Sequence, residues 1–577
     1  MKKRLILASY KKLLENKKVN ICITEDIFSL KEKDLSKYNI KVLKSHWHLP
    51  SKKIKDYNYL KKLYYLILKD LVKFLNNYHS KKISEKNWHI ILGPWLNYAI
   101  PILWDRWENV KNLKKKFGKI KRINTTNNYA NYLIPHDFND FIEKAQCQSW
   151  NAEIFKKIID TDKNWRPLYK KKYLLKKKNN ATKNSVFLNL IDKILLVIQK
   201  LLPRKKYIMS VGNFEKRFYL ELLFKNKKLT RLYNEFNESF KKVNKFEYKR
   251  NENLEIKSFF NKEFEKFLSK IILEILPVSY LENFQFYLMK VKKIKIKNKL
   301  IFTAFKHYKN DLFKIWLAYN DKKLISCIHG GNIEKEFFFN SWQKYSFKYI
   351  VWNKDELKKN QLNLPINFLI YRKKIKNLNY LNNNKIIFLL PHPEIKPLRL
   401  FDGLFSFEIL DSIKKWIKFY NSLNDQCLIN LSWRLGPFKD DWKIIEKLTS
   451  SLKKINISKE KSFIKDVNQA RLAIHVDLQT TFLETMYMNI PTVVLINNRF
   501  WNVTKRGKFI IKKLERAKIL FYNYNDMAKH INEHYLSLDK WWENSIVKDA
   551  RLSYLKYSGA NNINLEKKKW FNFFNNI

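Results

Sequence analysis

The sequence predicts an α/β protein with parallel sheets in both halves of the chain. Short apolar, β-branched runs alternate with helical patterns over the first third, and they return over residues 300–352 and 385–496. Strands that alternate with helices form a parallel sheet covered by helices on both faces. We therefore expect two Rossmann-like domains that face a cleft, with a helical insertion in the first half.

The length and the local composition place the domain boundaries. A chain of 577 residues is too long for one hydrophobic core, which favours two domains. The first is expected over residues 1–375, with the helical insertion at about 160–295, where the sequence is highly charged. A polar stretch from Lys373 to Asn384 leads into the second domain, residues 376–577, which ends in helices.

Each expected element follows from its own residues. Apolar positions three and four apart give one apolar face to a long helix, Tyr57 to Tyr78. The expected strands of the first domain are Arg4–Ser9, Val19–Thr24, Ile40–Leu43, Trp88–Leu92, Leu300–Ala304, Leu324–Ile328 and Lys348–Trp352. Those of the second domain are Lys385–Leu390, Cys427–Leu431, Arg471–Val476 and Thr492–Ile496.

The segment from Arg471 to Asn497 carries the strongest local signal. It predicts a strand, a tight loop, a helix and a second strand; Thr481 with Glu484 forms a capping box that begins the helix, and Pro491 ends it. A strand that leads into a helix N-terminus creates an anion site, because free N–H groups and the helix dipole point at the loop. Ligands of doubly wound sheets bind at this edge. Any βαβ unit of an α/β protein shows the same local pattern, which is the alternative.

A second candidate site follows the expected strand at 324–328. His329 precedes Gly330 and Gly331, and two glycines let the backbone approach a ligand closely. A histidine suits general-base catalysis there, because its pKa is near neutral. A Gly-Gly turn beside an incidental histidine is an equal alternative.

Two residues of the second half are candidates for contact with a phosphorylated donor. His392 lies between two prolines after the first strand of that half, and Arg434 follows the strand that begins at Cys427. A guanidinium offers a bidentate fork to phosphate. A surface arginine without a ligand is the alternative.

Aromatic residues mark a possible acceptor site in the first half. His46 and Trp47 follow one expected strand, and Gly93 and Trp95 follow another, so both pairs would lie at the same edge of a parallel sheet. An indole there can stack on a sugar ring or a base, and an imidazole can donate or accept a hydrogen bond. The alternative is that both tryptophans are ordinary half-buried aromatics.

The charge balance is extreme: 115 Lys and Arg residues against 53 Asp and Glu residues give a formal net charge of +62. The lysines are spread along the whole chain, and Asn, Ile, Phe and Tyr are also abundant, as expected of an A/T-rich genome. We therefore expect no nucleic-acid partner. Attraction to an anionic membrane surface or to phosphorylated substrates is favoured instead.

Other motifs narrow the class of protein. The four cysteines have no spacing typical of zinc sites or disulfides, so no metal is expected and a reducing cytosol fits. P-loop, HExxH, GxSxG and GxGxxG motifs do not occur, which disfavours kinases, metalloproteases, α/β-hydrolases and standard dehydrogenases. The most apolar stretch, Phe187 to Leu202, is interrupted by Asp192 and Lys193, so it is either an amphipathic helix on a membrane or a buried helix.

Segments spread over nearly the whole chain occur together in one known family. The chain resembles the leptospiral-type transferases of bacterial O-antigen and surface-polysaccharide biosynthesis, and the ordered set of segments is specific to that family. The segments are HWH at 46–48, LNNYH at 75–79, WHIILGPWL at 88–96, SWNAEIF at 149–155, LPVSYLENF at 276–284, FKIWLAY at 313–319, HGG at 329–331, TTFLETMYMNIPTVVLIN at 480–497, and WW at 541–542 followed by Ala550-Arg551.

The resemblance implies a cytoplasmic transferase of GT-B-like fold that acts near the inner membrane. HGG and TTFLE are also distantly similar to segments of polyglycerol-phosphate and capsule Kdo transferases. That similarity implies that His329 is the general base and that Thr480, Thr481 and the following amides hold the donor phosphates. Those relatives usually continue HGG with a further Gly and an aromatic residue, whereas Asn332 and Ile333 follow here, which puts the substrate scope in doubt.

Together these patterns and the resemblance predict an inverting, metal-independent glycosyltransferase of surface-polysaccharide biosynthesis. It would need no cofactor besides its nucleotide-activated sugar, and its acceptor would be a glycan or a lipid-linked glycan. The expected donor-site residues are Gly330, Gly331, His392, Arg434, Thr480, Thr481 and Glu484, and the expected acceptor-site residues are His46, Trp47, Gly93 and Trp95. The alternatives are a CDP-alcohol phosphotransferase of the same fold and a non-catalytic protein that binds glycans or nucleic acid.

Overall fold

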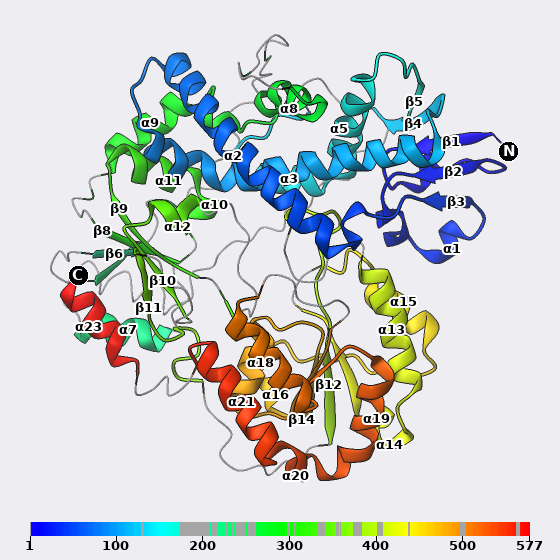
Figure 1. Ribbon diagram of the computed structural model, residues 1–577, viewed down its shortest axis with the longest axis vertical. Coiled ribbons are helices and arrows are strands. Elements are labelled where there is room, and N and C mark those ends of the chain that lie inside the picture. The colour runs from blue at the N-terminus through cyan, green and yellow to red at the C-terminus, as the bar shows by residue number, and fades with distance from the viewer. Residues whose placement is uncertain are drawn as a thin grey trace.

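The chain forms three parallel β-sheets surrounded by helices (Figure 1). The structure is a computed structural model. It describes residues 2–127, 132–172, 207–210, 216–225, 229–232, 236, 250, 256, 261–294, 296, 300–304, 306–328, 330–331, 341–352, 357, 359–372, 384–400, 408–436, 439–496, 503–560 and 566–577.

The first sheet has the strand order β3-β2-β1-β4-β5 and is parallel throughout. Its central strands are apolar because helices cover both faces, and Leu5 and Ile21 are fully buried. The strands are β1 (Lys3–Ile6), β2 (Val19–Cys22), β3 (Asn39–Val42), β4 (Arg122–Thr126) and β5 (Leu168–Lys172). The helices are α1 (Glu32–Leu35), α2 (Pro50–His79), α3 (Glu85–Phe117), α4 (Phe138–Gln146) and α5 (Gln148–Asp160).

The second sheet has the order β11-β10-β9-β8-β6-β7. Its strands are β6 (Tyr207–Ser210), β7 (Leu229–Leu232), β8 (Leu300–Thr303), β9 (Lys323–Cys327), β10 (Lys348–Val351) and β11 (Gln361–Asn363). The helices that lie between these strands in the chain are α7 (Lys216–Lys225), α8 (Glu263–Glu274), α9 (Phe284–Lys293), α10 (Lys306–Lys309), α11 (Asp311–Tyr319) and α12 (Ser341–Tyr345). The region expected as a helical insertion therefore holds α7, α8 and α9, and it also contributes β6 and β7 to this sheet.

The third sheet has the order β13-β12-β14-β15-β16. Its strands are β12 (Lys385–Leu389), β13 (Leu431–Arg434), β14 (Ala470–His475), β15 (Thr492–Leu495) and β16 (Leu520–Phe521). The helices that follow β12 are α13 (Ile409–Asn421), α14 (Asp425–Asn430), α15 (Ile444–Ser451), α16 (Phe463–Asn468), α17 (Thr480–Met488), α18 (Lys505–Arg516), α19 (Tyr524–His534), α20 (Leu538–Trp542), α21 (Ser545–Tyr557) and α23 (Lys568–Asn576).

The predicted fold class is confirmed: Rossmann-like parallel sheets lie in both halves of the chain, with a helical region in the first half. The sequence did not indicate that the first half divides into two sheets. Helices lie between consecutive strands in each of the three sheets, so the local pattern is similar in all of them. Which strands pair with which depends on long-range contacts that no local pattern encodes.

The strand expected at Trp88–Leu92 is wrong, because these residues lie inside the helix α3. Trp88, Ile91 and Leu92 are buried, as is nearly every residue from Trp88 to Leu103. A helix that is buried all around shows no apolar stripe, so its short apolar run is indistinguishable from that of a buried strand. Pro94 and Pro101, which favour a loop in the sequence, lie within this helix.

The strand expected at Cys427–Leu431 is also wrong over most of its length. The side chain of Asn424 caps α14 by accepting a hydrogen bond of 2.9 Å from the backbone N–H of Cys427. The helix continues to Asn430, and the strand β13 begins only at Leu431. Residue 434 consequently lies at the end of the strand rather than in the loop after it.

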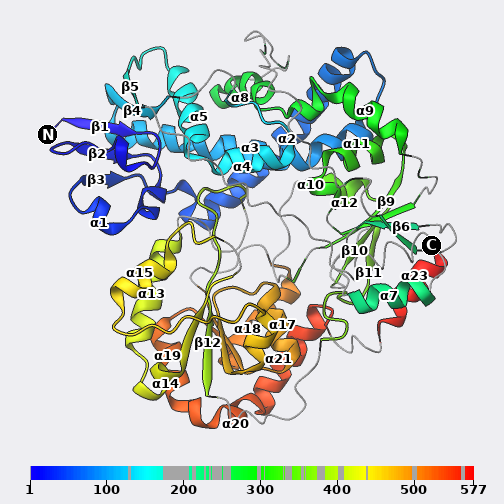
Figure 2. The same ribbon diagram turned by 180° about the vertical axis from the view of Figure 1, so that it is seen from behind.

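The second and third sheets share one continuous apolar core, which includes Phe302 and Ile350 of the second sheet and Ile474 of the third. The C-terminal helix α23 returns to the second sheet, where the indole N–H of Trp570 donates to the carbonyl oxygen of Pro365 at 2.9 Å. Figure 2 shows α23 beside α7 at the edge of the second sheet. This shared core holds the facing edges of the two sheets close together.

The long helix α3 links the first and second sheets. It contacts α5 of the first sheet as well as α11 and α12 of the second. Both ribbon views show the first sheet at one end of α3 and the second sheet at the other (Figures 1 and 2). Of the helices that the structure describes, none is long and apolar enough to cross a membrane, and the stretch Phe187–Leu202 lies outside the described residues.

Candidate active site

The helix α17 begins at the carboxyl end of β14, a strand with neighbours on both sides in the third sheet. The carboxyl group of Asp477 forms the turn between them by accepting the backbone N–H of Gln479 at 3.2 Å. Gln479 is the N-cap residue, and its side chain makes no capping hydrogen bond. The N–H groups of the first helical turn therefore receive no partner from the N-cap side chain.

The capping box expected between Thr481 and Glu484 is wrong. The helix begins one residue earlier, at Thr480, and Glu484 lies in its second turn. The buried carboxylate of Glu484 forms an ion pair of 3.2 Å with Arg372 instead of reaching back to the N-cap backbone. Because Asp477 already closes the turn, the backbone enters the helix before Thr481.

The Gly-Gly loop after β9 lies directly on the first turn of α17. The backbone N–H of Gly331 donates to Thr480 Oγ1 at 3.1 Å, and the indole N–H of Trp352 donates to the carbonyl oxygen of Gly330 at 2.9 Å. The structure thus brings together two segments that are 150 residues apart and that the sequence marked separately. Gly330, Gly331 and Thr480 form one site between the second and third sheets.

Both glycines are required by this close approach. Gly330 has a φ of +74°, and a Cβ atom there would lie 2.5 Å from Thr480 Oγ1. A Cβ atom on Gly331 would lie 2.5 Å from Cδ2 of Leu483. A side chain at either position requires the loop or the facing side chain of Thr480 or Leu483 to shift.

His329, the expected general base, lies outside the described residues. It directly precedes Gly330 in the sequence, so its assignment rests on that neighbourhood and stays a prediction.

Burial controls the protonation of the groups next to this site. Burial raises the pKa of Asp477 to about 6, partly opposed by the N–H of Gln479. Burial lowers the pKa of His475 to about 3, so its ring is neutral, and its Nε2 lies 3.0 Å from Thr485 Oγ1. At neutral pH the N-terminal end of α17 therefore lies next to the ionised carboxylate of Asp477 and the uncharged ring of His475.

Arg434 is placed as a structural partner within the third sheet. Its guanidinium is buried and forms an ion pair with the carboxylate of Asp466. It also donates to the carbonyl oxygens of Glu460 at 2.6 Å and Lys461 at 3.2 Å. These bonds hold the guanidinium at the end of β13, and its contact with a donor phosphate stays a prediction.

His392 lies exposed in the loop that follows β12, the strand next to β14. Partial burial of its ring lowers its pKa, opposed by the carboxylates of Asp441 and Asp440. Its contact with a donor stays a prediction.

The four expected acceptor residues do not share one sheet edge. His46 and Trp47 lie in a short 3₁₀ turn after β3, where Trp47 is buried and its indole N–H donates to Asp56 at 2.8 Å. Gly93 and Trp95 lie buried within α3. The prediction that Gly93 and Trp95 follow a strand is wrong, because residues 88–92 belong to the helix α3.

Two residues at the site were not identified from the sequence, Trp352 and Arg372. Trp352 follows β10, the neighbour of β9, so its position at a strand end was a usable signal. Arg372 pairs with Glu484 across 112 positions, which no local pattern indicates. Within the described part of the chain, no three His, Cys, Asp or Glu side chains are grouped so that they could hold a metal ion.

The protein is of the α/β class. Its candidate site lies where the glycine loop after β9 of the second sheet contacts the N-terminus of α17, which follows β14 of the third sheet. The chain belongs to the LIC12162 family of transferases, whose sequence model matches residues 3–574. It is therefore a member of a transferase family. No curated protein matches the chain.

Several solved structures are similar to part of the chain. HepE from Anabaena, solved with UDP and glucose, is 10% identical with a TM-score of 0.36 and covers 64% of this chain and 100% of its own. The UDP-GlcNAc 2-epimerase from Neisseria meningitidis, bound to UDP-GlcNAc, is 10% identical with a TM-score of 0.36 and covers 64% and 99%. WaaG, a glycosyltransferase involved in lipopolysaccharide biosynthesis, is 10% identical with a TM-score of 0.28 and covers 51% and 95%.

Proposed function

We propose that this protein transfers a sugar from a nucleotide-activated donor to a glycan or lipid-linked acceptor in the assembly of a bacterial surface polysaccharide such as O-antigen. One observation carries the proposal: in a member of a transferase family, the glycine loop after β9 lies on the N-terminus of α17. The resemblance to surface-polysaccharide transferases supports the pathway.

The donor phosphates are proposed to bind at the first turn of α17. The backbone N–H groups of that turn and the positive end of the helix dipole stabilise an anion at this place. The hydroxyl oxygen of Thr480 accepts from Gly331, which leaves its proton free to donate to a phosphate oxygen. Thr481, half-buried in the same turn, adds a second hydroxyl.

The proposed chemistry is a single displacement with inversion. His329 removes the proton from the acceptor hydroxyl, whose oxygen forms a bond to the anomeric carbon of the donor sugar. The bond from that carbon to the phosphate oxygen breaks, and the nucleoside diphosphate leaves with the electron pair. The charge that develops on the leaving group is stabilised by the N–H groups and the dipole of α17, so no metal ion is required.

The proposed setting is the cytoplasmic face of the inner membrane. A net charge of +62 favours contact with anionic lipid headgroups, where a lipid-linked acceptor would be presented.

Nucleotide binding tests the donor site. Thermal unfolding is measured with UDP, GDP, CDP, CMP and dTDP and their sugars, because a ligand of the folded state raises the midpoint. We expect one nucleotide class to raise it. In Thr480→Val, which keeps the shape and removes the hydroxyl, we expect a loss of at least tenfold in affinity. Thr449→Val, a change at an exposed threonine, is the matched control. Absence of any nucleotide effect, or equal binding by Thr480→Val and wild type, would overturn the donor site.

Turnover tests the base. His329→Ala is expected to abolish sugar transfer while nucleotide binding is retained, and His136→Ala, a change at an exposed histidine, should leave transfer unchanged. Full turnover by a folded His329→Ala variant would contradict the assignment. A reaction with CDP-glycerol alone would instead identify a phosphotransferase of the same fold.

A further inference from the structure

A single peptide unit joins the two halves of the candidate site. The carbonyl oxygen of Gly330 accepts from the indole N–H of Trp352 at 2.9 Å, and the N–H of Gly331 donates to Thr480 Oγ1 at 3.1 Å. These two groups belong to the same peptide bond, which is planar, so its C=O and its N–H point in opposite directions. A bond that fixes the carbonyl oxygen therefore also fixes the direction of the N–H.

The residues on both sides of this peptide are glycines, which have no Cβ atom to restrict its rotation. Gly330 has a φ of +74°, and glycine occupies positive and negative φ about equally readily. Without the bond from Trp352, the peptide can rotate at little steric cost, and the N–H of Gly331 would then turn away from Thr480. The conformation of the glycine loop therefore depends on the indole.

The indole is itself held firmly. The side chain of Trp352 is buried, and its ring lies 6.4 Å from that of Trp570 in α23. The backbone carbonyl oxygen of Trp352 accepts from the side-chain amide of Asn363 in β11 at 2.7 Å. Gly559, which follows α21, packs on the same carbonyl so closely that a Cβ atom there would lie 2.2 Å from its oxygen. Trp352 can thus act as a fixed support for the loop.

We propose that Trp352 is a positioning residue of the donor site, which acts through the Gly330–Gly331 peptide on the hydroxyl group of Thr480. A hydroxyl oxygen that accepts from Gly331 directs its own proton away from that N–H, which makes the proton available to a phosphate oxygen at the first turn of α17. Hydrogen bonds in such a chain strengthen one another. This inference rests on the proposed function, because the phosphate is that of the nucleotide-activated donor.

Calorimetry with UDP, GDP, CDP, CMP and dTDP tests the effect on binding. Trp352→Phe keeps an aromatic ring and removes the indole N–H, so the affinity of the nucleotide that binds wild type should fall at least fivefold. Trp165→Phe is the matched control, because its buried indole N–H also donates to a backbone carbonyl, that of Ile120 at 3.1 Å. It should bind as wild type does. Wild-type affinity in Trp352→Phe, or an equal loss in Trp165→Phe, would overturn the proposal.

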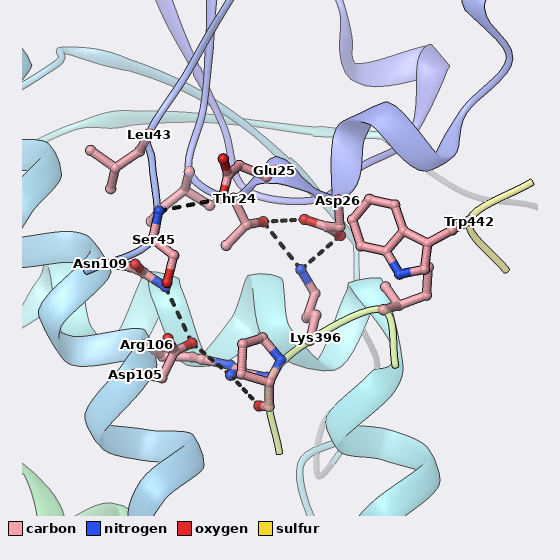
Figure 3. Close-up of a pocket in the computed structure, with 13 residues that line it drawn as sticks. Thr24, Glu25, Asp26, Leu43, Ser45, Asp105, Arg106, Asn109, Lys396 and Trp442 are labelled. Carbon is pink, nitrogen blue, oxygen red and sulfur yellow. Dashed lines mark hydrogen bonds and ion pairs between the residues drawn. The ribbon is translucent and has the colours of Figure 1, made fainter. Parts of the chain in front are cut away.

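A double variant separates positioning from a general loss of stability. If Trp352 acts through Thr480, Trp352→Phe combined with Thr480→Val should bind the nucleotide as weakly as Thr480→Val alone, whereas losses that multiply would overturn the proposal. Lys396→Met is the control for stability. Figure 3 shows Lys396 beside Asp26, and this ion pair of 2.8 Å joins the first and third sheets. Its loss should lower the unfolding midpoint and leave the affinity unchanged; a loss of affinity as large as in Trp352→Phe would mean that binding only follows stability, against the proposal.

Hydrogen exchange tests the positioning without any nucleotide. The exchange rate of the Gly331 amide, measured by mass spectrometry with electron-transfer fragmentation, should rise at least tenfold in Trp352→Phe, because the bond to Thr480 is lost. Unchanged exchange would overturn the proposal even where nucleotides bind. If no nucleotide binds wild type, the proposed function fails, and faster exchange still assigns the orientation of the loop to Trp352. If Trp352→Phe does not fold, benzothienylalanine at position 352, in which sulfur replaces the N–H in a ring of the same shape, takes its place in every measurement.

Discussion

The substitution Asp477→Asn separates the electrostatics of the candidate site from its shape. Asp477 closes the turn before α17, and its Oδ1 accepts the N–H of Gln479 at 3.2 Å. An asparagine keeps this bond, because its carbonyl oxygen accepts in the same geometry. The substitution removes only the negative charge that the native carboxyl group acquires at neutral pH.

The size of the effect follows from the pKa. Burial raises the pKa of Asp477 from 3.8 to about 6, a change of about two pH units, which corresponds to about 3 kcal/mol. The folded state holds the proton more tightly than the unfolded state, so ionisation lowers the free energy of unfolding. This loss develops between about pH 4 and pH 6 and is complete above that range. Asp477→Asn should therefore raise the free energy of unfolding by up to about 3 kcal/mol at pH 7.5 and by almost nothing at pH 4.

The assay is urea unfolding followed by circular dichroism at pH 7.5 and pH 4, read as the difference between the variant and wild type. Asp425→Asn, at an exposed carboxylate of α14, is the control and should show no pH-dependent gain of that size. A variant no more stable than wild type at pH 7.5, or one equally stabilised at both pH values, would refute the argument. The affinity for a nucleotide should also rise at pH 7.5, because an ionised carboxylate opposes phosphate at this turn.

Three further variants test the contacts between the sheets. Gly330→Ala places a side chain at a φ of +74° and against Thr480. We expect the free energy of unfolding to fall by about 1–2 kcal/mol and the nucleotide affinity to fall by a larger proportion. Wild-type affinity would contradict the close approach of the loop to α17. Lys396→Met leaves the buried Asp26 without its partner and should cost about 3–5 kcal/mol in urea unfolding, and a neutral result would mean that the pair is not buried in solution. Arg434→Lys should lower the unfolding midpoint, because the ion pair with Asp466 is weakened, while nucleotide affinity, measured by calorimetry, changes less than threefold. A tenfold loss of affinity would instead support Arg434 as a donor contact.

The sequence predicted the strands of the fold well wherever a strand is short, apolar and followed by a periodic helix. The predictions for β1, β9, β10 and β14 fall within three residues of the observed bounds. It failed at α3, where burial on every side removes the helical stripe, and at α14, where a capped helix of six residues resembles a strand. The pairing of strands into three sheets depends on contacts between distant residues and was not accessible from local patterns.

The candidate site was predictable in its two halves but not in its contacts. A Gly-Gly pair after a strand and a threonine pair at a helix start each carry a physical reason for binding a ligand. Their contact, 3.1 Å between the Gly331 nitrogen and Thr480 Oγ1, required the structure. At Arg434 the local pattern gave no sign of the ion pair with Asp466, which lies 32 positions away.

The family segments divide into two groups by what their polar side chains contact. In most of them those side chains bond to other buried residues: Asn151 accepts from Arg106 at 2.8 Å, and Tyr280 donates to Asp311 at 2.8 Å. Removing either partner of such a bond leaves a buried polar group without a hydrogen bond. This cost explains why these residues occur together. The Gly330–Gly331 loop and the helix that begins at Thr480 differ, because Gly331 donates to Thr480 while the N-cap side chain makes no hydrogen bond to the first turn of α17. We therefore expect the glycine loop and the start of α17 to bind the substrate, and the other segments to stabilise the fold.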